Sequence, residues 1–216
     1  MSISQSLHPS VFISSTFVDF MDERQAIADV LRSESINVNA LDIQPASNNS
    51  SKSQIERGIK EADFVILLVG DRYGSILPKM TGGRRSVTHW EYLLASKKYK
   101  KHVLVFFRNS SHLTGERKLY DDADEELKEK QFKLKQFKTQ LSELHNPSYF
   151  NSIAELTEKV KSSIVPAYRG IISDLNMKDS QRKARILELE SEIERLKNNP
   201  FSDAMADAFK AARGEL

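Results

Sequence analysis

Short apolar runs alternate with segments of helical periodicity along the first half of the chain. Runs rich in β-branched and aromatic residues, each typical of a strand, occur at residues 10–14, 36–43, 64–70 and 102–107. Between them, apolar residues recur three or four positions apart on charged segments, which predicts helices at residues 18–33, 53–62 and 87–98. The expected order is therefore β-α-β-α-β-α-β.

The run Phe64–Gly70 indicates how these elements assemble. It is apolar almost throughout, which is typical of a strand covered on both faces, so we expect it at the centre of the sheet. Strands that alternate with helices favour parallel pairing through right-handed crossovers. The sequence predicts an α/β fold, a flavodoxin-like parallel sheet of order 2-1-3-4 flanked by helices, in a domain over residues 8–170.

Polar side chains gather after the first and third expected strands. Since the order 2-1-3-4 reverses direction between these strands, both clusters are expected at one crevice at the carboxyl ends of the strands, where ligands bind in such sheets. The helix after the glycine-rich loop borders the same crevice. The expected substrate-binding residues are Ser14, Ser15, Thr16, Asp19, Asp71, Arg72, Tyr73, Gly74, Thr88 and Trp90, and the candidate catalytic residue is Glu91.

Helix capping offers an alternative explanation for several of these residues. The hydroxyls of Ser14 to Thr16 also suit the start of the following helix. Glu91 lies three residues after Thr88, which is the spacing of a capping box. The same spacing predicts helix starts at Ser53 with Glu56 and at Ser152 with Glu155.

The chain changes character after the fourth expected strand. The charged stretch 116–144 predicts a helix with an intermittent apolar stripe, and "PSYF" at 147–150 predicts a short edge strand. A further helix should reach Val165 and kink or end at Pro166.

Residues 171–216 are expected to form a helical extension with a short coiled coil. In a heptad reading, apolar residues occupy the a and d positions at Ile172, Leu175, Ile186, Leu189, Ile193 and Leu196. In a parallel pair Arg185 would face Glu190 and Glu192 would face Lys197, which favours a homodimer or higher assembly. The alternative is that this stripe packs on its own domain.

Composition excludes several classes of function. The net charge of +2 argues against a dedicated nucleic-acid surface. The absence of cysteine excludes disulfides and zinc-cysteine sites, and the scattered histidines form no HExxH pair, so we expect no metal site. With no apolar run of membrane length and no signal peptide, the expected location is cytoplasmic. The chain contains neither GxxxxGK[ST] nor GxGxxG, and no cofactor is expected.

Three blocks of the sequence carry a resemblance to known families. "VFISSTFVDFMDER", "IERGIKEADFVILLVGDRYG" and "SVTHWEYLLASKKYKKHVLVFF" resemble the family of domain of unknown function 4062 and, more distantly, Toll/interleukin-1 receptor (TIR) domains. The resemblance covers about residues 10–108. It implies a flavodoxin-like fold that serves as an effector or assembly module in signalling and bacterial immunity. Enzymatic TIR domains cleave NAD at the nicotinamide–ribose bond with a glutamate on the helix after strand three, and the resemblance implies this role for Glu91.

Three hypotheses follow for function. The first is an NAD(P)+ glycohydrolase, an N-glycosidase that takes NAD or a related nucleotide as substrate. The second is a non-enzymatic module that assembles through its sheet edges and helical tail. The third is a nucleoside deoxyribosyltransferase-like enzyme, which needs a proton donor that only Asp19 or Asp71 would supply. Nothing in the sequence separates the first two.

Overall fold

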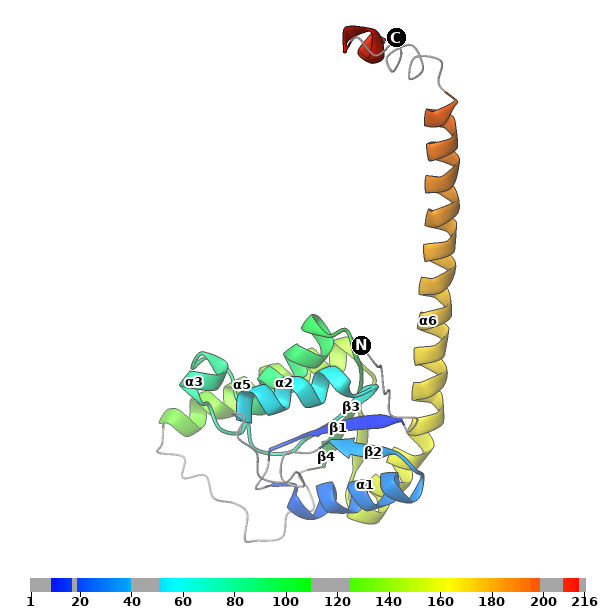
Figure 1. Cartoon of the computed structure of the whole chain (residues 1–216). Helices are drawn as coiled ribbons and strands as arrows, with labels where there is room; N and C mark the ends of the chain where they lie inside the picture. The colour runs from blue at the N-terminus through cyan, green and yellow to red at the C-terminus, as the bar shows by residue number, and fades with distance from the viewer. Residues whose placement is uncertain (1–8, 17–18, 40–50, 110–124, 199–207, 214–216) are drawn as a thin grey trace. The chain divides into compact units, whose positions relative to one another are not determined.

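The computed structural model describes residues 9–16, 19–39, 51–109, 125–198 and 208–213 of the chain (Figure 1). The elements are β1 (Ser10–Ser14), α1 (Met21–Ser33), β2 (Asn37–Asn39), α2 (Ser51–Glu61), β3 (Phe64–Val69), α3 (Pro78–Thr81), α4 (Val87–Leu93), the π-helical turn η2 (Leu94–Lys98), β4 (His102–Arg108), α5 (Glu125–Leu144), β5 (Ser148–Phe150) and α6 (Ile153–Lys197). The chain divides into two compact units, Met1–Ala167 and Tyr168–Leu216.

The five strands form one parallel sheet of order β2-β1-β3-β4-β5. The predicted order 2-1-3-4 is confirmed, and β5 joins β4 as the expected edge strand. The central strand is β3, and all six of its residues are buried because helices cover both of its faces. Of the predicted second strand, residues 37–39 are β2, and residues 40–43 lie outside the described part.

Helices cover the sheet on both sides (Figure 1). Strand register places Phe12 beside Val65 and Val65 beside Val103, so these side chains share one face of the sheet. Apolar residues of α2, α4, η2 and α5 pack onto that face. The opposite face is covered by α1 and the first turns of α6, whose buried apolar residues are Ile27, Ala28, Leu31, Leu156, Val160, Ile164 and Ala167. In Figure 1, α2 and α5 lie above the sheet and α1 lies below it.

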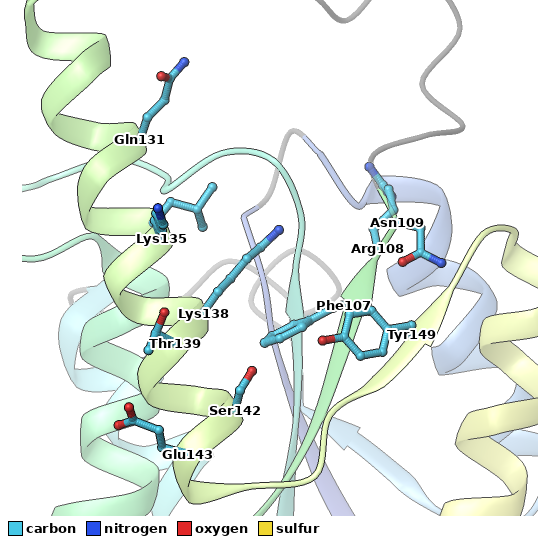
Figure 2. Close-up of a pocket in the computed structure, with 11 residues that line it drawn as sticks. Phe107, Arg108, Asn109, Gln131, Lys135, Lys138, Thr139, Ser142, Glu143 and Tyr149 are labelled. Atoms are coloured by element: carbon cyan, nitrogen blue, oxygen red, sulfur yellow. The ribbon is translucent and has the colours of Figure 1, made fainter.

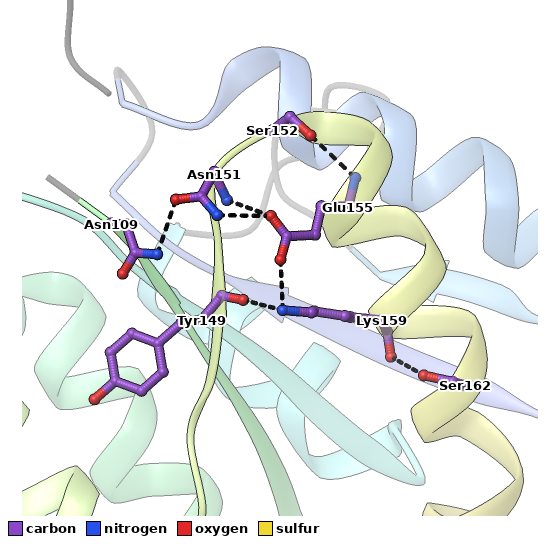
Figure 3. Close-up of polar contacts among 7 residues, drawn as sticks. All are labelled: Asn109, Tyr149, Asn151, Ser152, Glu155, Lys159 and Ser162. Atoms are coloured by element: carbon purple, nitrogen blue, oxygen red, sulfur yellow. Dashed lines mark hydrogen bonds and ion pairs between the residues drawn. The ribbon is translucent and has the colours of Figure 1, made fainter. Parts of the chain in front are cut away.

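One of the predicted helix starts is wrong and one is confirmed. Ser53 lies inside α2, which already begins at Ser51, and the carboxylate of Glu56 instead pairs with the Lys98 ammonium at 3.3 Å. At the start of α6 the backbone N–H of Glu155 donates to the Ser152 hydroxyl at 3.2 Å, as predicted (Figure 3). The Glu155 carboxylate accepts from the backbone N–H of Asn151 at 2.8 Å, one residue earlier than a standard capping box requires.

Of two later helices, one extends further than predicted and the other agrees with its prediction over the described residues. Helix α6 continues through Pro166 to Lys197, so of the two outcomes expected at this proline, a kink or an end, the end is wrong. A proline removes a single intrahelical hydrogen bond, and the buried Ile164 and Ala167 hold the helix on either side of it. The predicted helix 116–144 is α5 over its described part, where Leu134, Phe137 and Leu141 form the buried stripe.

Within the described residues, no helix has the length and apolar character that crossing a membrane would require.

The heptad positions of the second unit are open to solvent. Ile186, Leu189, Ile193 and Leu196 are between 45% and 54% exposed. A row of half-exposed aliphatic side chains at this spacing is typical of a helix that packs against a partner.

Candidate functional site

The centre of the candidate site is a hydrogen bond between two residues 77 positions apart. Ser14 ends β1, Glu91 lies on α4, and their exposed fractions are only 1% and 6%. The Ser14 hydroxyl donates to Glu91 Oε2 at 2.5 Å. The hydroxyl at the end of β1 and an acid on α4 therefore meet at the carboxyl end of β1.

The capping-box interpretation of Glu91 is wrong. The cap of α4 is Ser86, whose hydroxyl accepts from the backbone N–H of His89 at 3.2 Å. Because the helix already begins at Val87, Thr88 is a buried residue inside its first turn, and Glu91 is not needed as a capping partner. The Glu91 carboxylate instead accepts the hydrogen bond from Ser14.

A glycine brings the two loops of the crevice together. Gly74, after β3, has φ of +90°, a conformation that residues with a side chain rarely adopt. A Cβ at this position would lie 2.8 Å from the methyl group of Thr16 and 3.6 Å from Cβ of Ser86. The loops after β1 and β3 can approach this closely only because position 74 is glycine.

Burial changes the acidity of Glu91. Loss of solvation raises the pKa of this carboxyl to about 7, and the hydrogen bond from Ser14 and the charge of Arg24 oppose the increase only in part. At neutral pH the side chain is therefore divided between the ionised and protonated forms. A raised pKa in a carboxyl at the switch point of an α/β sheet is typical of a functional site.

Asp19 joins the two predicted clusters. The Thr16 hydroxyl donates to Asp19 Oδ2 at 2.7 Å, and the Arg72 guanidinium lies 3.3 Å from Asp19 Oδ1. Residues that follow β1 and β3 thus contact each other at the carboxyl ends of these strands. Arg72 remains about one third exposed and can still reach an anionic ligand.

Two arginines border the same region and were not identified from the sequence. Arg24 is 5% exposed and donates to the carbonyl oxygen of Ile13 at 3.2 Å and to the Ser15 hydroxyl at 3.0 Å. Arg108 ends β4, donates to the backbone carbonyl of Asp19 at 2.7 Å and pairs with Glu23.

A sequence signal existed for both arginines. Arg24 stands three residues before Ile27 and seven before Leu31, on the apolar stripe of its helix, where a charge needs a buried partner. Arg108 directly follows the fourth apolar run, at the carboxyl edge of the sheet.

The aromatic residues expected to line the crevice are engaged in packing. Tyr73 is 5% exposed, and its hydroxyl lies 2.8 Å from Nδ1 of His89. The His89 ring stacks on Phe137, and burial lowers the pKa of this histidine to about 4, so it is neutral at pH 7. Trp90 is half-buried against the cluster beneath α2, with the Lys52 ammonium 5.9 Å from its ring centroid.

Asp71 differs from the other expected residues because one of its oxygens lacks a partner. Its Oδ2 is buried and receives no hydrogen bond from the described residues. No cluster of three or more histidine or acidic side chains that would hold a metal occurs in the described part of the chain.

Solved structures similar to this chain include the following two. The CMP N-glycosidase BcmB of Clostridium botulinum aligns with a TM-score of 0.37 and 18% identity, over 70% of this chain and 98% of that one. The TIR domains of the activated Roq1 resistosome align with a TM-score of 0.47 and 15% identity, over 72% and 99% of the two chains. No curated protein matches the sequence. The family model of a domain of unknown function, DUF4062, matches residues 10–165, and the chain belongs to this family.

Proposed function

We propose that this domain cleaves the N-glycosidic bond of NAD or a related nucleotide, with Glu91 as the catalytic carboxylate. The observation that supports the proposal is the buried carboxyl of Glu91, hydrogen-bonded by Ser14 at the carboxyl end of β1. An effector or signalling role in bacterial-type immunity is part of the same proposal.

The chemistry of NAD suits a single carboxylate. When the bond between the ribose and the cationic nicotinamide breaks, its electron pair leaves with nicotinamide, which is neutral and needs no proton donor. Positive charge develops on the ribosyl group, and an ionised Glu91 stabilises it. Water then adds to the ribosyl carbon and releases a proton to solvent. The Ser14 hydroxyl orients the carboxylate throughout.

The residues around Glu91 supply further groups for binding. In this proposal Ser15, Thr16 and Asp19 contact the ribose hydroxyls, and the exposed part of Arg72 contacts a phosphate. The pairing of Asp19 with Thr16 and Arg72 supports such a role because it orients these polar groups before a ligand arrives.

The direct test follows nicotinamide release from NAD and NADP by the full chain at high protein concentration, resolved by liquid chromatography. Cleavage that depends on the protein supports the proposal. If no cleavage occurs with either nucleotide, even in assembled protein, the glycohydrolase proposal is wrong and an assembly module is the better explanation.

The pH dependence of the reaction should follow the ionisation of the Glu91 carboxyl. Because burial raises the pKa of this carboxyl to about 7 and the reactive form is ionised, kcat/KM should increase about tenfold per pH unit below that value and level off above it. Initial rates at low NAD concentration between pH 5 and pH 8.5 measure this profile. A rate that stays constant down to pH 5 would contradict the assignment.

We also propose that the chain forms a parallel homodimer through α6. The half-exposed row Ile186, Leu189, Ile193 and Leu196 supports this second role, since a helix gains stability by burying such a row.

Substitution on this row tests the dimer. Leu189→Asp places a charge in the proposed seam and should convert a dimer to a monomer at micromolar concentration, as measured by light scattering. Leu187→Asp is the matched control, because Leu187 is 69% exposed and lies outside the seam. A monomeric wild type rejects the proposal.

A further inference from the structure

A pocket of about 600 Å³ lies between α5 and the neighbouring strands β4 and β5, separate from the bond between Ser14 and Glu91 (Figure 2). One wall is a polar stripe of α5 that includes Lys135, Lys138 and Ser142. The other wall is aromatic and consists of Phe107 and Tyr149. The volume is in the range of small-molecule sites in proteins, roughly 300–1,000 Å³.

The sheet register produces the aromatic wall. Phe107 of β4 pairs with Tyr149 of β5, so both side chains point to the same face, and their rings meet edge to face at 5.5 Å. Because β5 is the edge strand, Tyr149 is half exposed, while Phe107 is 3% exposed. Tyr149 therefore presents an aromatic surface on which another ring can stack.

The helical period produces the polar wall. Lys135, Lys138 and Ser142 are three and four positions apart and share one side of α5. Leu134, Phe137 and Leu141 anchor the helix in the core. In Figure 2 the Lys138 side chain extends from α5 across the pocket past the Phe107 ring, and its ammonium lies 5.7 Å from the centroid of that ring.

Cationic side chains outnumber carboxylates among the residues that line the pocket. Neither Lys135 nor Lys138 forms a hydrogen bond or an ion pair with the described residues. The carboxylate of Asp71 acts on the Lys138 ammonium through its charge alone. The lining contains one carboxylate, Glu143, which Figure 2 shows at the far end of the helix stripe from Lys135. Arg108 also lines the pocket, but its guanidinium already pairs with Glu23. Two lysines thus remain available to an anion.

We propose that this pocket binds a phosphate monoester that carries a planar ring, such as a nucleoside monophosphate. The ammonium groups of Lys135 and Lys138 bind the phosphate, and Tyr149 stacks on the ring. The hydroxyls of Thr139 and Ser142, which also line the pocket, hydrogen-bond the part of the ligand between them. Since no residue of this pocket is assigned to bond cleavage, the proposal does not depend on the chemistry of Glu91.

Calorimetric titration of the full chain with adenosine 5′-monophosphate, adenosine and inorganic phosphate tests the site at low ionic strength. We expect the monophosphate to bind at least about tenfold more tightly than either fragment, since it uses both walls of the pocket. Added salt should weaken its binding. If adenosine binds as tightly as the monophosphate, the lysines do not bind its phosphate. If inorganic phosphate binds as tightly as the monophosphate, the aromatic wall does not contact its ring. Either result overturns the proposal, as does the absence of binding at millimolar ligand.

Variants locate the ligand on the protein. Lys138→Gln should weaken binding of both the monophosphate and phosphate about tenfold, whereas Tyr149→Ala should weaken only the monophosphate. Lys60→Gln alters an exposed lysine on α2 and is the matched control, which should leave the affinity for both ligands unchanged. Binding should persist in Glu91→Gln. Loss of binding in that variant would place the ligand at Glu91 and reject this pocket, and unchanged affinity in Lys138→Gln would reject it as well.

Discussion

Glu91→Gln should abolish nucleotide cleavage and leave the domain folded. The amide keeps the shape of the side chain and can still accept the hydrogen bond from Ser14, which is 2.5 Å long in the wild type. It lacks the negative charge that stabilises the ribosyl cation in the transition state. Removal of one preorganised group of this kind commonly costs about two to three orders of magnitude in kcat. Nicotinamide release under single-turnover conditions measures the loss.

Two further variants show whether the loss of turnover is specific to the charge of Glu91. Glu34→Gln alters an exposed glutamate directly after α1 and should retain full turnover. Ser14→Ala removes the donor that orients Glu91 and should reduce kcat less than Glu91→Gln does, because the charge remains. Full turnover in Glu91→Gln would exclude Glu91 as the catalytic carboxylate and leave a structural role for it.

The same Glu91→Gln variant should be more stable than the wild type in alkaline solution. Burial raises the pKa of Glu91 from 4.5 to about 7, so the folded protein holds this proton more tightly than the unfolded chain does. The contribution of the group to stability is complete below pH 4.5 and is lost as the pH rises through 7. From the pKa shift, the free energy of unfolding of the wild type should fall by roughly 2–3 kcal/mol relative to that of Glu91→Gln between pH 5 and pH 8.

Urea unfolding of both proteins at pH 5 and at pH 8 measures this difference. The change with pH is the informative quantity, because any packing cost of the amide is the same at both values. Glu34→Gln should show no such divergence from the wild type. If the free energies of unfolding of Glu91→Gln and the wild type differ by the same amount at both pH values, the Glu91 carboxyl has an ordinary pKa. That result would remove the basis for the predicted pH–rate profile.

The sequence by itself determined the order of the strands and helices and the central place of β3. These features depend on the spacing of apolar residues within one segment, as in Phe64–Val69, whose continuous apolar character requires cover on both faces. The start of α6 at Ser152 was also predictable, since the cap and its partner lie three residues apart. The meeting of the loops after β1 and β3 followed from the strand order, because parallel strands end at the same edge.

Only the tertiary structure decided which side chains of the crevice contact each other. Ser14 and Glu91 are 77 positions apart, and their bond depends on strand register and on the rotation of α4 about its axis. That rotation was not predictable, because Ser86 and Thr88 are both acceptable caps and the difference of two residues turns the helix by more than half a revolution. Ser86 caps the helix, and Glu91 consequently faces Ser14.

The pocket beside α5 depends on tertiary structure for the same reason. Lys138 and Tyr149 belong to separate elements, and neither forms a recognisable motif in the sequence. Local patterns specify a helix or a strand because their interactions lie within a few residues of each other. A site between elements depends on register, helix rotation and the burial of charge, and these are set only when the whole domain packs.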